Sequence, residues 1–170
     1  MNNHFYWMFL VLLMGCSSAN PNRSLERTNP LSGQSFPPDA LITQRAVLTA
    51  RGRQFSLNGY VAKSQSQGLR LILTENFGGV LAEVVVNPAG QVFVMQAKPP
   101  FRREWVERYI AADLKCIFGQ TSEPDCPVTA TGSKHFRVER RWYKLDLWTV
   151  EIKPGPQPAE AFDVSRGGHL

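Results

Sequence analysis

The chain has 170 residues and a formal net charge of +5, and its first fifteen residues contain no Asp, Glu, Lys or Arg. The 155 residues that follow are enough for one domain with a real core and too few for two domains of ordinary size. Because these residues carry all of the net charge, the composition suits an anionic membrane surface or acidic partners.

Residues 1–15 have the pattern of a secretion signal. Their apolar run from Phe5 to Met14 is too short to span a bilayer and has the length of a signal-peptide core. The residues before this run include no Lys or Arg, which departs from the usual positive start of such a signal. Nucleic acid is a poor partner for a secreted protein, so we do not expect it to bind this chain.

The apolar run ends in Leu13-Met14-Gly15-Cys16, which resembles a bacterial lipobox. The resemblance implies that Cys16 is acylated and becomes the first residue of the mature chain. An ordinary signal peptide that happens to contain a cysteine is the alternative. Ser17 in place of Asp resembles the signal that releases lipoproteins to the outer membrane. We therefore expect a protein that is lipid-anchored at the outer membrane and faces the periplasm.

Residues 16–38 combine this cysteine with a stretch that is rich in Ser, Asn and Pro and has no sustained apolar period. Such a composition is typical of a flexible tether. The 22 residues after the cysteine would span on the order of 25 Å root mean square. The single domain, residues 39–170, could then stand clear of the membrane and still touch it.

The domain begins with a series of strand-like segments. Leu41 to Ala50 is compatible with a helix running into a strand, whereas Arg53 to Lys63 alternates apolar and polar residues as a strand with one buried face does. A turn at Ser64 to Gly68 precedes a hairpin over residues 69–86, and a short connection leads into Gln91 to Lys98. Five such segments predict an antiparallel meander that curls on itself.

The hairpin of residues 69–86 has apolar residues at every second position of both strands, which places them on one face. Gly78 and Gly79 supply the backbone freedom that the turn between the strands needs. Phe77 stands beside them. A phenylalanine at a solvated tip either folds back onto the core or contacts a partner outside the domain.

Arg70 to Thr74, followed by two polar residues and Phe77-Gly78, resembles a hairpin of LolB, the outer-membrane receptor that accepts lipoproteins from the periplasmic carrier LolA. The likeness covers residues 53–83 and is shared with other LolB-like lipoproteins. It implies that Phe77 enters the membrane, as an exposed leucine does in that family. It also implies contact with membrane lipid, a lipoprotein or lipid cargo, and a LolA-like carrier as donor. We expect a monomer.

After Pro99-Pro100 the apolar period becomes helical over Arg102 to Phe118, and Gly119 would end the helix. In the LolA and LolB fold, helices cover the mouth of the sheet or fill its concavity. The expected fold is therefore mainly β (α+β), a curled antiparallel sheet forming an incomplete barrel with a covering amphipathic helix. Five apolar side chains are expected to line a site for acyl chains: Leu57, Leu71, Val84, Trp105 and Ile110.

Cys116 and Cys126 lie at the end of this helix and in the loop that follows. In an oxidising periplasm they are expected to form a disulfide, and two unpaired thiols are the alternative. Zinc would need further ligands, and His135 and His169 have no metal-site spacing. We therefore expect no metal and no cofactor.

The last third of the chain again has the pattern of strands. Apolar and polar residues alternate from Phe136 to Trp142 and from Trp148 to Ile152, and Ala161 to Ser165 is compatible with one more strand. Five basic residues in this region are expected to meet either phospholipid headgroups or solvent on a strand face: Lys134, Arg137, Arg140, Arg141 and Lys144.

Catalysis finds little support in the sequence. Once His4 leaves with the signal, it would rest on His135 or His169, and neither lies in a nucleophile-elbow, metal or paired-carboxylate pattern. Asp113 and Glu83 are isolated acids of the kind that face solvent or form an ion pair.

Two classes without catalysis remain. One is a carrier of lipids or lipoproteins, which predicts an apolar cavity inside the sheet. The other is a structural or assembly lipoprotein of the cell envelope that binds a protein partner, which predicts a packed interior. We expect a lipoprotein of the first class rather than an enzyme.

Overall fold

The computed structural model describes residues 36–119 and 126–165. The predicted signal peptide, the lipidation site Cys16 and residues 17–35 of the tether lie outside the described residues, and so does His169. No helix in the described ranges is long and apolar enough to cross a bilayer.

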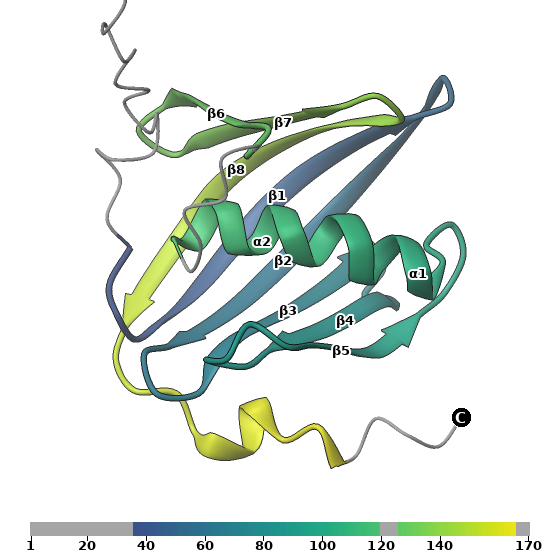
Figure 1. Ribbon diagram of the computed structural model, residues 1–170. Coiled ribbons are helices and arrows are strands. Elements are labelled where there is room, and N and C mark those ends of the chain that lie inside the picture. The colour runs from purple at the N-terminus through teal and green to yellow at the C-terminus, as the bar shows by residue number, and fades with distance from the viewer. Residues whose placement is uncertain (1–35, 120–125, 166–170) are drawn as a thin grey trace, which may run out of the picture.

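Eight antiparallel strands form one unclosed sheet in the order β5-β4-β3-β2-β1-β8-β7-β6 (Figure 1). The first five strands follow one another as a meander, and the last three are added on the other side of β1. The predicted mainly β, antiparallel architecture is therefore confirmed. The strands are β1 Ala40–Ala50, β2 Arg53–Ser64, β3 Gly68–Glu75, β4 Val80–Val86, β5 Val92–Ala97, β6 Val128–Gly132, β7 His135–Arg140 and β8 Tyr143–Pro154.

The expectation that Leu41 to Ala50 begins as a helix is wrong. β1 is a strand over its full eleven residues, because it pairs with β2 on one side and β8 on the other. Its buried residues alternate along the strand and include the small Ala40 and the polar Gln44. Because these two residues are not large and apolar, the alternation of buried and exposed positions is not evident from the sequence. Gln44 is satisfied by donating a hydrogen bond from Nε2 to Thr149 Oγ1 at 3.4 Å.

One helical segment lies across the concave face of the sheet (Figure 1). It consists of α1 Arg103–Trp105, a π-helical stretch η1 Val106–Ile110 and α2 Ala111–Phe118. Gly119 has φ 75°, a left-handed conformation that ends the helix at the predicted residue. The apolar side of the segment faces the sheet and completes the core, with Val106, Ile110 and Leu114 buried.

A disulfide joins Cys116 of α2 to Cys126, just before β6, with the two Cα atoms 5.8 Å apart. This is the pairing that the sequence predicted. The bond fastens the end of the helix to the β6 edge of the sheet, and it leaves the other end of the helix to be held by side-chain contacts.

The prediction of a C-terminal strand at Ala161 to Ser165 is wrong. The chain instead forms a 3-10 helix, η2 Ala159–Phe162, which follows three prolines within five residues. Proline lacks the backbone N–H that a strand ladder needs, so these residues cannot extend the sheet. Phe162 is buried on the outer face, and Arg70 Nη1 of β3 donates a hydrogen bond to the Ala161 carbonyl at 2.7 Å.

The face of β8 also differs from the sequence pattern. Leu145, Leu147 and Thr149 point into the core, whereas Trp148 and Val150 are 40% and 50% exposed. A register shift between β1 and β8 beside Thr43 and Gln44 accompanies this arrangement. Trp142 does not lie on a strand, because Arg141 and Trp142 form the turn between β7 and β8.

Candidate functional site

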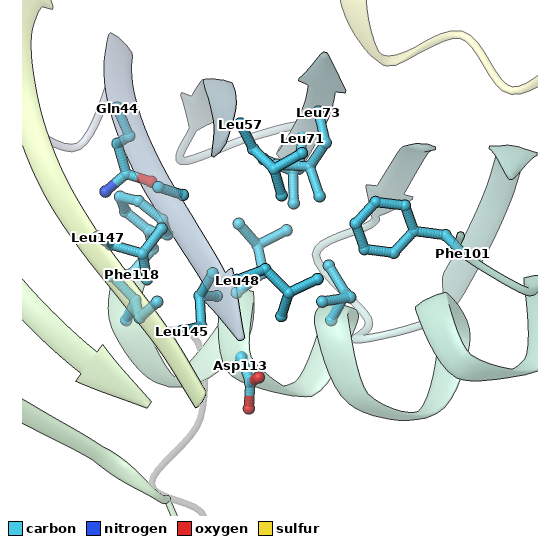
Figure 2. Close-up of a pocket in the computed structure, with 14 residues that line it drawn as sticks. Gln44, Leu48, Leu57, Leu71, Leu73, Phe101, Asp113, Phe118, Leu145 and Leu147 are labelled. Atoms are coloured by element: carbon cyan, nitrogen blue, oxygen red, sulfur yellow. The ribbon is translucent and has the colours of Figure 1, made fainter. Parts of the chain in front are cut away.

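An apolar hollow lies between the concave face of the sheet and the helix. Figure 2 shows its wall, with Leu57, Leu71 and Leu73 on one side, Phe101 and Phe118 at opposite ends, and Asp113 on the helix side. Its volume is about 30 Å³, which is room for about one water molecule. The domain therefore has a small, largely apolar hollow in an otherwise packed interior.

The five residues expected to line a cavity fall into three groups. Leu57, Leu71 and Ile110 lie on the wall of the hollow. Val84 is fully buried in the core but is not part of this wall, and Trp105 lines a separate groove outside the hollow. The sequence placed all five on apolar faces but could not tell which of them would border empty space.

Asp113 is the polar exception on the helix side of the hollow. It is 2% exposed, and its Oδ1 accepts hydrogen bonds from Arg140 Nη2 at 2.6 Å and Nε at 2.9 Å. The Tyr143 hydroxyl donates to Asp113 Oδ2. Because Arg140 ends β7 and Tyr143 begins β8, this cluster ties α2 to two strands of the sheet.

Burial raises the pKa of Asp113, and the hydrogen bonds and charge of Arg140 and the hydrogen bond of Tyr143 oppose the rise without cancelling it. Burial and the neighbouring carboxylate raise the pKa of Tyr143, so its hydroxyl remains a donor at neutral pH. Asp113 is therefore not solvent-facing, and it forms an ion pair with Arg140. It fastens the helix to the sheet.

A second and much larger depression, a groove of about 840 Å³, opens beside the start of the helix. We call it the arginine groove. It shares Leu48 and Phe101 with the hollow, so the two spaces meet at these side chains. Its lining residues are Leu48, Ala50, Arg51, Arg53, Phe55, Pro100, Phe101, Arg102, Trp105, Tyr109 and Trp142.

The arginine groove lies at the same end of the sheet as Phe77. The strand register places Arg53 and Ala50 opposite each other and sets Ala50 beside Tyr143, so the β1–β2 and β7–β8 turns share one end. The pairing of Leu57 with Glu75 brings the β3–β4 turn to that end too. We call it the tip end (the β1–β2 and β7–β8 turns are at upper right in Figure 1).

Phe77 is 99% exposed at the tip of the β3–β4 turn. The turn is closed by hydrogen bonds of 3.0 Å from Gly78 N to the Glu75 carbonyl and from Glu75 N to the Gly79 carbonyl. Gly78 has φ 88°, which a residue with a side chain rarely adopts. Phe77 therefore does not fold back onto the core, which was one of its two expected positions.

Acidic partners compensate part of the basic cluster of the C-terminal strands. Arg137 Nε lies 2.7 Å from Asp146 Oδ1, and Lys144 Nζ lies 3.1 Å from Glu139 Oε1. Arg140 is committed to Asp113, while the Arg141 guanidinium lies over the Trp142 ring at 4.7 Å. Partial burial raises the pKa of Asp146, but the hydrogen bond and charge of Arg137 outweigh it and lower the pKa overall. Three of the five basic residues are therefore paired with acids, whereas Lys134 is exposed and Arg141 keeps its charge.

The arginine groove was missed in the sequence. Its arginines, Arg51, Arg53 and Arg102, come from segments about fifty residues apart, and only the fold brings them together. The available signal was local: Arg51-Gly52-Arg53 forms a turn between two strands, and two arginines follow Pro99-Pro100-Phe101. Glu83, which looked isolated, pairs with Arg70 at 2.6 Å.

The described part of the chain contains no cluster of three metal-ligating side chains. His135 stacks on Trp148 with ring centroids 4.6 Å apart, and its Nε2 lies 3.3 Å from Asp146 Oδ1. Neither a comparison with models of protein families nor a search of curated proteins found a match for this chain.

Proposed function

We propose that this protein is an outer-membrane lipoprotein whose domain leans on the bilayer through Phe77 and takes up acyl chains between its sheet and helix. In this role it would help to receive or insert lipoproteins or lipids, as the resemblance to LolB suggests. The observation that carries the proposal is the complete exposure of Phe77 at the tip of an ordered turn. When an exposed phenylalanine enters the bilayer interface, its apolar ring is removed from water, which is favourable.

The anchor and the tip would act together. Cys16 would hold the chain in the membrane, and β1 begins at the end of the sheet opposite Phe77. The eleven residues of β1 span about 36 Å, whereas the 22 residues from 17 to 38 can extend to roughly 75 Å. The tether is therefore long enough for the tip end to turn toward the membrane that holds the anchor.

Acyl chains would enter by displacement of the helix. The hollow has an apolar wall, but it is too small for an acyl chain while the helix lies on the sheet. The Asp113 cluster holds the helix to β7 and β8 in this position. Movement of the start of the helix, with its end fixed by the disulfide, would enlarge the hollow. Transfer would then run from weaker to stronger binding without an energy source.

The small volume of the hollow favours a second candidate, a structural or assembly lipoprotein that binds a protein partner. In that case the interior would stay packed and the helix would not move. The two candidates differ in whether an acyl chain ever touches the inner wall.

Photo-crosslinking separates these candidates. The full chain, purified from its membrane in mild detergent, is mixed with a diazirine-labelled fatty acid, irradiated and digested, and the labelled peptides are identified by mass spectrometry. The proposal expects label on peptides that contain Leu57, Leu71 or Ile110. Label confined to the outer face, or none, would favour the assembly role, with a co-purifying protein as its positive sign.

A further inference from the structure

We infer that the arginine groove is a binding site for the phosphate headgroup of an anionic phospholipid. This inference rests on the proposed function only in that Phe77 brings the tip end to the membrane. It goes further, because it assigns a ligand class and a set of residues to a groove outside the hollow.

The groove carries uncompensated positive charge. Its wall contains Arg51, Arg53 and Arg102 and no Asp or Glu. Within the described ranges no carboxylate lies within 4.0 Å of these three guanidinium groups, whereas Arg70, Arg137 and Arg140 are each paired with an acid. A guanidinium offers several N–H donors in one plane, which matches the oxygens of a phosphate.

Aromatic rings complete the groove. Trp105 and Tyr109 come from the helix, and Trp142 stands 59% exposed on the β7–β8 turn. Trp and Tyr concentrate at the headgroup level of membranes, because each joins an apolar ring to a polar N–H or O–H group. Charge alone would suit any anion, but charge beside aromatic rings suits an amphiphile.

The turn that carries Arg51 is a second indication. Arg51 has φ 51° and Gly52 has φ 73°, so both residues of this two-residue turn are left-handed. Asn-Gly is the preferred pair for such a turn, and arginine is uncommon in this conformation. The turn itself requires the left-handed conformation at both positions, so the unusual feature is the residue: an arginine stands where asparagine would fit the backbone better.

The groove also has a path for the rest of the lipid. Phe101, 3% exposed, belongs to both the groove and the hollow, and its ring packs on Trp105 with centroids 5.4 Å apart. In Figure 2 its side chain points from its loop into the hollow. A phosphate on the arginines would place the acyl chains against Phe101 and Trp105, at the border with the apolar interior.

Native mass spectrometry of the full chain in detergent tests the site. The protein is titrated separately with dioleoyl phosphatidylglycerol and with dioleoyl phosphatidylcholine, which share acyl chains and a phosphate but differ in net charge. We expect tighter binding of phosphatidylglycerol. Arg53→Gln combined with Arg102→Gln should weaken that binding roughly 10- to 100-fold, because charge-assisted hydrogen bonds are lost.

The matched control is Arg45→Gln combined with Arg103→Gln, which removes the same charge from exposed residues that do not line the groove. It should leave phosphatidylglycerol binding unchanged. Equal loss in both double variants, or equal binding of the two lipids, would overturn the inference. Displacement of phosphatidylglycerol by inorganic phosphate would also overturn it, because the site would then serve a free anion.

Arg51→Asn separates binding from folding. Because asparagine prefers the left-handed conformation of this turn, the melting temperature should stay the same or rise by about 2–4 °C. Phosphatidylglycerol binding should nevertheless weaken. A variant that binds as well as the parent would remove Arg51 from the site.

Failure of the groove and failure of the proposed function are distinguishable. If the fatty acid labels the inner wall but phosphatidylglycerol shows no preference for the groove, the acyl-chain role stands and the headgroup site falls. Headgroup selectivity without inner-wall label would give the opposite result, a membrane-docking site on a domain with a closed interior.

Discussion

Asp113→Ala is expected to lower the free energy of unfolding by about 3 kcal/mol, the lower end of the loss for a broken buried pair, because it leaves the partly buried Arg140 guanidinium, whose side chain is 22% exposed, without its anion. The Tyr143 hydroxyl loses its acceptor at the same time. A domain of this size has about 5–15 kcal/mol to lose, so the variant should be close to the limit of folding. Urea or guanidinium denaturation followed by circular dichroism measures the change.

Glu139→Ala is the control, since it breaks a pair with Lys144 whose side chains are 64% and 43% exposed. An exposed pair of this kind contributes about 0–1 kcal/mol. Asp113→Ala and Arg140→Ala combined should cost less than the sum of the single changes, because the second removes the charge that the first leaves unpaired. If Asp113→Ala costs no more than Glu139→Ala, the cluster does not hold the helix.

The same variant bears on lipid uptake. If the Asp113 cluster keeps the helix seated, loosening it should increase photo-labelling of the inner wall under conditions in which the domain is still folded. Tyr143→Phe offers a milder step, because it removes one hydrogen bond and leaves the ion pair. A labelling increase that follows the order of the two stability losses would support a helix that opens.

Phe77→Glu is expected to fold normally and to lose membrane contact. The side chain is 99% exposed, so the melting temperature should change by less than a degree or two, as is usual for surface substitutions. Removing a phenylalanine from an apolar medium costs about 1.5–3 kcal/mol, which corresponds to roughly a 10- to 100-fold loss of partitioning. Release of bound lipid to vesicles, followed by fluorescence, should slow accordingly.

Two further variants frame this result. Phe77→Leu keeps an apolar tip and should retain most of the transfer. Phe136→Ala removes a fully buried phenylalanine and should cost about 3–5 kcal/mol of stability, which shows what a core position would do. A large fall in the melting temperature of Phe77→Glu, or transfer at the parental rate, would reject Phe77 as the membrane-facing tip.

Most of the local structure could be predicted from the sequence. Alternation along β2, β3 and β4 predicted strands, and the change of period after Pro99-Pro100 predicted the helix that Gly119 ends. These features are encoded by neighbours in the chain, because side-chain period and backbone conformation are local properties. The same locality makes Phe77 recognisable as the tip of a turn.

The errors arose where a residue's environment depends on distant partners. β1 became a strand because β2 and β8 flank it, and the proline-rich end of the chain turned into η2 against the outer face. Asp113 looked isolated because its partners, Arg140 and Tyr143, stand 27 and 30 residues away.

By itself the sequence determined the strand-rich fold, the single helix and the turn that carries Phe77, since each follows from residue patterns along the chain, whereas the structure decided that Phe77 is exposed and that Cys116 and Cys126 are bonded. Only the tertiary structure decided which apolar residues border the hollow, which arginines remain unpaired and which turns share the tip end. The physical reason is that cavities and charge compensation are properties of side chains from several strands meeting in space. The arginine groove draws on the β1–β2 turn, the helix and the β7–β8 turn, and only the strand register brings these segments together.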